Sequence, residues 1–183
     1  MQRRKFLQIT TAATPAILVG NNIPDPGERT AKGFVIKANE SRFDEKTMLG
    51  GKSPNNIKVS AKDTGSALTI FEYIGHEKGG PPLHLHHKQD EIFFIVEGEY
   101  LFKVGEDTYT LKSGDTIFLP RKVPHAFAQL TDHGKMFFMF QPSGKMEDFF
   151  RKVGAAMAPP TPAEGAKLFA AHEMLVVGPP LQF

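Results

Sequence analysis

Four residues with metal-ligating side chains stand at spacings that allow them to meet. In segment 79–91, Gly-Gly-Pro-Pro-Leu-His-Leu-His-His-Lys-Gln-Asp-Glu, His84 and His86 are two positions apart and Glu91 follows. Alternate side chains of a β-strand share a face, so both imidazoles can point toward one ion. His125 opens a later strand and supplies a fourth ligand. Three imidazoles and a carboxylate suit one divalent transition metal (Fe, Mn, Ni, Co, Cu or Zn), with positions left open for water, oxygen or substrate.

If Glu91 is to face the same ion, the strand must be interrupted between His86 and Glu91. Glu91 is an odd number of residues from His86, so an unbroken strand would place the two side chains on opposite faces. The polar residues 88–90 supply a turn or bulge that turns Glu91 back toward the imidazoles. The even steps from Glu91 to Phe93 and Ile95 predict that these two apolar side chains share its face, where they line a cavity or fill the core.

Other residues near this segment have more than one reading. His87 neighbours His86 on the opposite face, and it either competes for the metal or supports a ligand through a hydrogen bond. Arg121 and Lys122 either orient an anionic substrate or are solvated loop charges. A wholly structural reading, in which the histidines only form hydrogen bonds, is the alternative to a metal site. The remaining histidines are interpreted as surface or satisfied core residues: His76, His133 and His172.

Short runs with strand-like alternation dominate the middle of the chain. Turn residues at 97–98, 105–107 and 113–115 separate them, which favours an all-β barrel or sandwich of the jelly-roll kind. The stretch 49–56, with two glycines and a proline, reads as a flexible loop. The predicted strands are 34–38, 57–61, 67–74, 82–87, 92–96, 100–104, 109–111, 116–119, 125–130 and 136–141.

The hydrophobic period changes after Gln141. Apolar residues at 146, 149, 150, 153 and 157 recur at helical steps and predict one amphipathic helix whose stripe belongs to the core. Thr161-Pro162-Ala163-Glu164 is a capping box with proline at the first helical position, so a second helix starts there and runs toward His172. Both helices are expected to pack outside the barrel.

The N-terminal residues resemble an export signal. Gln-Arg-Arg-Lys-Phe-Leu-Gln at 2–8 precedes an uncharged, mildly apolar stretch at 9–20 and a Pro- and Gly-containing break. Adjacent Arg3 and Arg4 followed by Phe6-Leu7 resemble the twin-arginine type, which implies a bacterial protein exported to the periplasm or beyond. A disordered basic tail is the alternative. The expected organisation is an export signal at 1–24, a barrel at 30–142 and a C-terminal helical extension at 143–183.

Composition excludes several classes of function. The chain has no cysteine, so disulfides and thiolate ligands are ruled out, and its 16 phenylalanines predict a Phe-rich core. Removing the three charges of Arg3, Arg4 and Lys5 takes the net charge from +2 to −1. A near-neutral body without a basic stripe argues against nucleic-acid binding. No apolar run reaches the roughly 18 residues that a membrane span needs.

The predicted metal ligands and the glycines and proline near them resemble the two sequence motifs of the cupin superfamily. The first is matched at His84, His86, Glu91 and Gly98, and the second at Gly114, Pro120 and His125. In the departures from the pattern, Lys122 stands where glycine is usual, Gln129 stands where asparagine is frequent, and Gly79 lies one residue closer to His84. About 110 residues are covered, and the runs around the motifs look most like single-domain, quercetin-dioxygenase-like cupins.

The resemblance implies a cupin-type jelly-roll barrel and a metal-dependent dioxygenase acting on an aromatic or enolic compound. In that role the metal binds an enolate oxygen of the small-molecule substrate and Glu91 is catalytic, accepting or sharing its proton. A non-catalytic exported cupin that binds a metal or a small ligand is one alternative. A sugar isomerase or epimerase is another, which would need basic side chains inside the barrel. By analogy with other cupins, a homodimer is expected.

Overall fold

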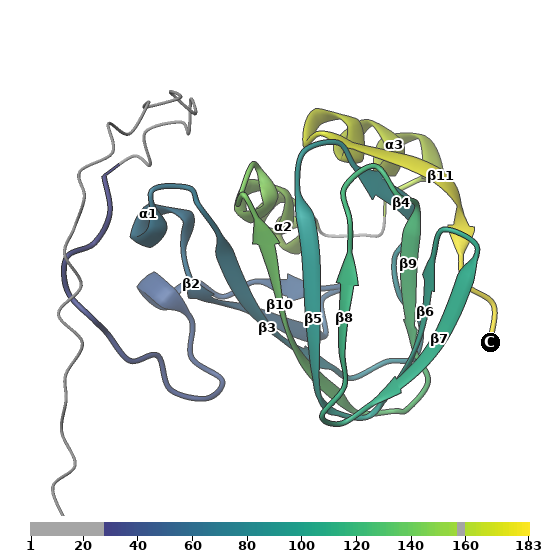
Figure 1. The fold of residues 1–183 in the computed structure, drawn as a ribbon, viewed down its shortest axis with the longest axis horizontal. Coiled ribbons are helices and arrows are strands. Elements are labelled where there is room, and N and C mark those ends of the chain that lie inside the picture. Colours follow the sequence, from purple (N-terminus) through teal and green to yellow (C-terminus); the bar gives the residue numbers. More distant parts are fainter. Residues whose placement is uncertain (1–27, 157–159) are drawn as a thin grey trace, which may run out of the picture.

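Two antiparallel β-sheets that face each other form the body of the molecule (Figure 1). The computed structural model describes residues 28–156 and 160–183, and the predicted export signal at 1–24 lies outside these ranges. The predicted all-β jelly-roll barrel with two C-terminal helices is confirmed. Within the described ranges, none of the helices is long and apolar enough to cross a membrane.

Each sheet places strands that are distant in sequence next to each other. The first sheet has the order β1 (Met48–Leu49), β2 (Ser53–Val59), β3 (Thr69–Gly75), β10 (Gly134–Gln141), β5 (Asp90–Glu97) and β8 (Thr116–Leu119). The second has the order β11 (Met174–Pro180), β4 (Pro82–His86), β9 (His125–Gln129), β6 (Glu99–Val104) and β7 (Asp107–Lys112).

The core between the sheets is built largely from phenylalanine, as the composition predicts. Phe138 stacks on Phe71 and on Phe93, with ring centroids 5.1 and 5.3 Å apart. Phe93 in turn meets Phe102 of the opposite sheet edge to face at 5.1 Å. Such pairs stabilise a core beyond the area they bury, by about 0.5–1.5 kcal/mol each. The continuous aromatic packing therefore joins the two sheets into one rigid barrel.

Two N-terminal predictions were wrong. Residues 34–38 form no strand: in the described part of the chain no strand pairs with them, and Val35 is 85% exposed. The stretch 49–56 is not a loop, because Gly50 and Gly51 adopt positive φ and connect β1 to β2. Ser53 and Asn55 are buried in β2 despite their polarity. Backbone pairing with β1 and β3, which composition does not reveal, buries them.

The predicted strand at 57–61 also ends early. Ser60 caps a short helix, α1 (Ala61–Thr64), and its hydroxyl and the Asp63 carboxylate form a capping box. The sequence Ser-Ala-Lys-Asp carries this signal, which competes with strand pairing at that point. A 3₁₀ turn, η1 (Arg42–Asp44), lies beside it and directs Arg42 toward Asp63.

The two C-terminal helices are confirmed as α2 (Met146–Ala155) and α3 (Pro162–Ala171). The predicted capping box of α3 forms between Thr161 and Glu164. Met146 and Phe149 bury the apolar face of α2. Both helices lie outside the strands toward the same end of the barrel, with α3 beside β11 (Figure 1).

Strand β11 was not predicted. Among the described residues it pairs with β4 alone and is an edge strand, and Leu175 and Val177 are 48% and 43% exposed. Gly178, Pro179 and Pro180 read as turn residues in the sequence, yet an edge strand tolerates proline because its free side needs no N–H donor.

Candidate metal centre

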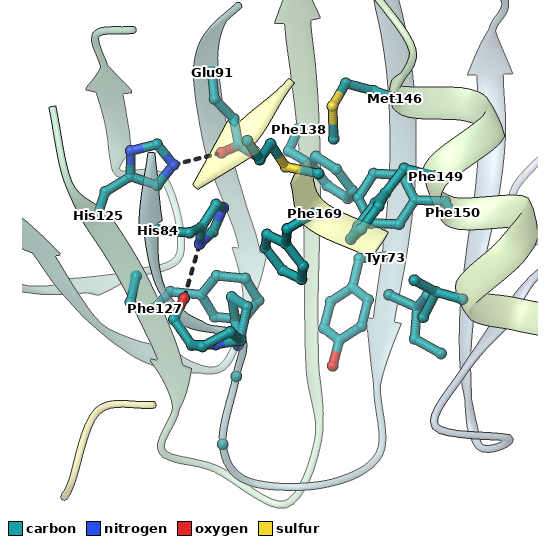
Figure 2. Close-up of a pocket in the computed structure, with 18 of the residues that line it drawn as sticks. Tyr73, His84, Glu91, His125, Phe127, Phe138, Met146, Phe149, Phe150 and Phe169 are labelled. Atoms are coloured by element: carbon teal, nitrogen blue, oxygen red, sulfur yellow. Dashed lines mark hydrogen bonds and ion pairs between the residues drawn. The ribbon is translucent and has the colours of Figure 1, made fainter. Parts of the chain in front are cut away.

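The structure brings the four predicted donors together. One ligating atom of each of His84, His86, Glu91 and His125 lies within 4.8 Å of all the others, and all four residues are buried. His84 and His86 come from β4 and His125 from the start of β9, where it pairs directly with His84. Glu91 comes from β5 in the opposite sheet. The cluster therefore spans the interior of the barrel (Figure 2).

The break predicted before Glu91 is present and is larger than a bulge. Strand β4 ends at His86, residues 87–89 turn, and β5 begins at Asp90 in the other sheet. This change of sheet turns Glu91 to face the imidazoles. The Oε2 atom of Glu91 lies 3.3 Å from Nε2 of His125 and 3.6 Å from Nε2 of His86.

Backbone carbonyls orient two of the imidazoles. With Nδ1 protonated, His84 donates to the carbonyl of Pro82 at 2.8 Å and His125 to the carbonyl of Val123 at 3.0 Å. In this tautomer Nε2 of each ring carries the lone pair, and it faces the cluster. An imidazole held in this way through its outer nitrogen is typical of metal sites.

Several buried polar atoms of the cluster have no hydrogen-bond partner. They are both ring nitrogens of His86 and Nε2 of His125, and the contacts of the two Nε2 atoms with Glu91 are not aligned as hydrogen bonds. Leaving a buried polar group unpaired costs about 1–3 kcal/mol. A cation between these atoms would satisfy both Nε2 atoms and the carboxylate together, so the donor set fits a metal ion.

The electrostatics also suit a cation. Burial, helped by the neighbouring His125 and His86, lowers the pKa of His84 to about 3, so this imidazole is neutral at neutral pH. Burial alone would raise the pKa of Glu91, but its contacts with His125 and His86 outweigh burial and hold that pKa below its ordinary value. A neutral imidazole beside a carboxylate anion is the protonation state that metal ligation requires.

The remaining histidines lie away from the cluster. His87 is exposed, so it neither competes for the cluster nor supports it from inside the barrel. His76 and His133 are exposed and face each other, with their Nδ1 atoms 3.4 Å apart. His172 is buried and satisfied by the Leu168 carbonyl and the Asp148 carboxylate. Their interpretation as surface or satisfied core residues is confirmed.

The charged loop residues do not face the donors. Arg121 is exposed and forms an ion pair with Asp90, to which its backbone N–H also donates at 2.8 Å. Lys122 is exposed as well. The reading of both as solvated loop charges fits these positions better than contact with an anionic substrate.

A cavity of about 390 Å³ adjoins the donor cluster. Phe93 lines it as predicted, whereas Ile95 is buried in the core and is not part of the wall. Apart from the donors, the charged residues of the lining are Glu77 and Lys78. Much of the remaining lining belongs to the barrel strands: Tyr73, Leu119, Phe127, Met136, Phe138 and Phe140.

The C-terminal helices also line this cavity, which the sequence did not reveal. The apolar stripe of the first helix was interpreted as core, but it serves two surfaces at once: Met146 and Phe149 are buried in the core and also face the cavity. No feature of the stripe distinguishes these two roles. The lining residues from this region are Met146, Phe149, Phe150, Val153, Gly165, Leu168 and Phe169.

Comparison with known proteins agrees with this architecture. Residues 70–140 match the family model of the cupin domain. This stretch, which includes much of the barrel, is therefore similar to cupin domains. The solved structure of KdgF from a Halomonas species covers 61% of this chain and 94% of its own, with a TM-score of 0.52 at 15% identity, which supports the shared fold.

Two curated proteins match shorter parts of the chain. An uncharacterized protein of Methanocaldococcus jannaschii is 42% identical over 43 residues, which are 24% of this chain and 34% of that protein. Quercetin 2,3-dioxygenase of Bacillus subtilis is 22% identical over 106 residues, which are 58% of this chain and 31% of that enzyme. The chain thus spans about a third of the length of either relative.

The structure explains one glycine that matches the cupin motifs and one departure from them. Gly98 has φ +88°, and a Cβ there would lie 2.8 Å from the carbonyl oxygen of His133, so only glycine fits. Lys122, at the position where the motif usually has glycine, has φ +66°. Its N–H donates to the His86 carbonyl at 2.7 Å. Lysine therefore keeps the backbone shape of the motif at a conformational cost that glycine would avoid.

Proposed function

We propose that this protein binds one divalent transition metal ion through His84, His86, Glu91 and His125 and acts as a dioxygenase on aromatic or enolic small molecules. The observation that carries the proposal is that two features occur at the same place in the barrel. Buried, unpaired donor atoms lie at a cavity whose other walls are largely apolar and aromatic. Ligand sites commonly combine apolar walls with a few convergent polar groups in this way.

The bound ion and the side chains of the protein would have different roles in the proposed reaction. When bound, the metal supplies a Lewis acid that polarises an oxygen of the substrate. Glu91 Oε2 is placed to accept the proton of an enol that binds at the cluster, because its carboxylate is ionised and faces both the donors and the cavity. The aromatic walls exclude water and hold a planar ring beside the donors.

The similarity to the quercetin dioxygenase of Bacillus subtilis supports the reaction class. The dioxygenase activity belongs to that enzyme, of which this chain matches 31%, and its transfer here is part of the proposal. In the described residues, Lys78 is the sole lysine or arginine of the cavity lining. A phosphorylated sugar would need more cationic groups, which disfavours an isomerase or epimerase.

A non-catalytic cupin that binds a metal or a small ligand is the second candidate. One observation favours it: apart from the donors, the charged residues of the cavity are Glu77 and Lys78, which directly precede the two glycines of the β3–β4 connection. Glu91 would therefore have to act both as ligand and as proton acceptor. Oxygen consumption separates the two candidates.

Export and dimer formation complete the proposal. The twin-arginine-like residues Arg3 and Arg4 support export to the periplasm or the extracellular space. Analogy with other cupins supports a homodimer. Fractionation of cells that express the full chain, with an Arg3→Lys/Arg4→Lys variant as control, tests export, and light scattering tests the dimer.

Metal analysis of the purified protein tests the proposal first. We expect about one transition metal ion per chain, large loss of the metal in His125→Ala, and full retention in His87→Ala, which removes an exposed imidazole beside the donors. Equal metal content in both variants would refute the site.

Oxygen uptake with flavonol-like and diketone substrates then tests catalysis. We expect uptake by the metal-loaded protein and its loss in Glu91→Ala. No uptake by a fully loaded site would favour the non-catalytic candidate. Full activity of Glu91→Ala would remove this carboxylate from the mechanism.

A further inference from the structure

The cavity has two kinds of wall. One consists of barrel strands within the cupin-like stretch, and the other is contributed by α2 and α3, which follow residues 70–140 in sequence. Phe149 and Phe150 of α2 and Leu168 and Phe169 of α3 all face the cavity. A ligand at the donor cluster therefore contacts residues that the cupin motifs do not specify.

Phe169 is the helix residue next to the donors. Its ring meets the His84 imidazole edge to face, with centroids 5.2 Å apart and an interplanar angle of 79°. Its other neighbour is Phe149, at 5.0 Å and 78°. Figure 2 shows Phe169 between His84 and Phe149. His84 is 7% exposed, against 1% for His86 and 2% for His125, so Phe169 lies against the most accessible imidazole of the cluster.

Phe169 itself is half-buried and has room for a ligand on its cavity side. Across the cavity the barrel contributes Phe127 and Phe138, which also face it (Figure 2). A flat ring that reaches the donors would therefore have aromatic side chains on both sides. Aromatic pairs with centroids 4.5–7 Å apart are favourable in offset-stacked and edge-to-face arrangements.

The position of α3 is fixed by contacts outside the cavity. With Nδ1 protonated, His172 donates to the Leu168 carbonyl at 2.7 Å, and its Nε2 lies 3.0 Å from the Asp148 carboxylate of α2. Strand β11, which follows α3, pairs Val176 with His84 on β4. Phe169 is thus held relative to His84 by a helix contact on one side and a strand ladder on the other. Because these contacts limit how far Phe169 can move, this wall of the cavity selects ligands by their shape.

We infer that Phe169 is a specificity-determining residue, and that the C-terminal segment of α2, α3 and β11 sets the size of the ring that fits beside the donors. The ligand is a planar aromatic molecule with a metal-binding oxygen, one ring of which packs on Phe169. Its body is uncharged, because the lining near Phe169 is apolar. This inference rests on the proposed metal site.

The test compares a one-ring and a three-ring probe on cobalt-loaded protein. Kd values for catechol and for quercetin are measured by calorimetry without oxygen, for the wild type, Phe169→Ala and Phe169→Leu. In Phe169→Ala we expect Kd for catechol to rise about tenfold, the equivalent of one lost aromatic pair of about 1.4 kcal/mol. Kd for quercetin should stay the same or fall, because the alanine leaves space for the larger molecule.

The controls separate this inference from the proposed function. Phe118→Ala removes a phenylalanine that is 55% exposed on the barrel exterior, and it should change neither Kd. Cobalt content and the visible spectrum of the ion should match the wild type in every variant. Phe169→Leu, which keeps most of the volume and is the more certain to fold, should weaken catechol binding with little gain for quercetin.

Three results would overturn the inference. If both Kd values shift by the same factor, or neither shifts, while cobalt remains bound, Phe169 does not select ligands and the metal site stands. If loaded wild-type protein binds neither probe, the ligand class is wrong. If the wild type holds no cobalt, the proposed function fails and this inference fails with it.

Discussion

Two buried glutamates of this molecule sit in opposite kinds of surroundings. Glu147 on α2 is 7% exposed, and its carboxylate accepts hydrogen bonds from Ser60 Oγ at 3.1 Å, Thr69 Oγ1 at 2.9 Å, the Ala61 N–H and Arg151. Glu91 on β5 is 5% exposed and faces imidazole nitrogens that are not aligned to donate to it. One carboxylate is saturated with donors, while the other faces unpaired nitrogen atoms.

This difference indicates a structural role for Glu147 and a functional role for Glu91. The Glu147 network docks α2 and the start of α1 onto the barrel, and every donor that reaches it is provided by the chain. The Glu91 cluster is incomplete as a set of protein groups, and folding tolerates this cost because an external partner can meet it. Residue types alone would not distinguish the two sites, since each is a buried carboxylate among polar side chains.

Removal of Glu147 should have the largest effect on stability. Glu147→Ala leaves Arg151 and three other donors without their acceptor, so we expect the free energy of unfolding to fall by about 3–5 kcal/mol. Urea denaturation of metal-free protein measures it. Glu106→Ala, at an exposed turn, is the control and should change stability by less than about 0.5 kcal/mol. A small loss in Glu147→Ala would contradict the view that this network is structural.

Removal of the Glu91 charge should have a smaller effect, and one that depends on metal. In chelated protein we expect Glu91→Gln to change the free energy of unfolding by less than about 1 kcal/mol, within the range of mild substitutions. Metal at about 100 times Kd should stabilise the wild type by about 2.7 kcal/mol and the variant far less. Thermal melts with and without added metal measure both. Equal stabilisation of the two proteins would show that Glu91 is not a ligand.

Acid should lower the stability of the region around the Glu147 network, because it protonates Asp63 of α1. This carboxylate accepts from Arg42 at 2.9 Å and from the Ser60 N–H at 2.9 Å, and the Arg42 guanidinium holds its pKa below the ordinary value. Because the folded-state pKa lies below the unfolded one, the stabilisation is present above about pH 4 and is lost as pH falls through the folded-state pKa.

Urea unfolding of metal-free protein between about pH 7 and pH 2 tests the role of Asp63. Asp63→Asn should be less stable than the wild type at pH 7, and its stability should fall less steeply in acid. Parallel pH profiles for the two proteins would assign the acid sensitivity to other groups.

Sequence reasoning found the donors because their geometry follows from local rules. Alternation along a strand places His84 and His86 on one face, and the polar residues after them make a break before Glu91 necessary. His125 was harder to place, since its pairing with His84 across β4 and β9 is a long-range contact. Its residue type and its place at the start of a strand made it a candidate, and the resemblance to the cupin motifs supported that link.

The missed features depend on partners that local patterns do not specify. Residues 34–38 alternate like a strand but have no strand to pair with in the described part of the chain. Ser53 and Asn55 look like a loop, but Ser53 pairs with β1 and Asn55 with β3. Strand β11 was not predicted, because Gly178 and the two prolines are unfavourable residues for a strand. The stripe of α2 revealed an apolar face but not that a cavity shares that face with the core.

The place of β11 in the sheet has a consequence for the order in which the protein matures. Strand β4, which carries His84 and His86, lies between β9 and β11, and β11 is translated after the other strands that the structure describes. While the ribosome still holds residues 174–180, one side of β4 is uncovered and α3 has no strand to pack on. The nascent barrel can collapse around its phenylalanines before then, but the walled cavity beside the imidazoles is finished only afterwards. We therefore expect the proposed metal ion to be loaded selectively only after this strand has been synthesised.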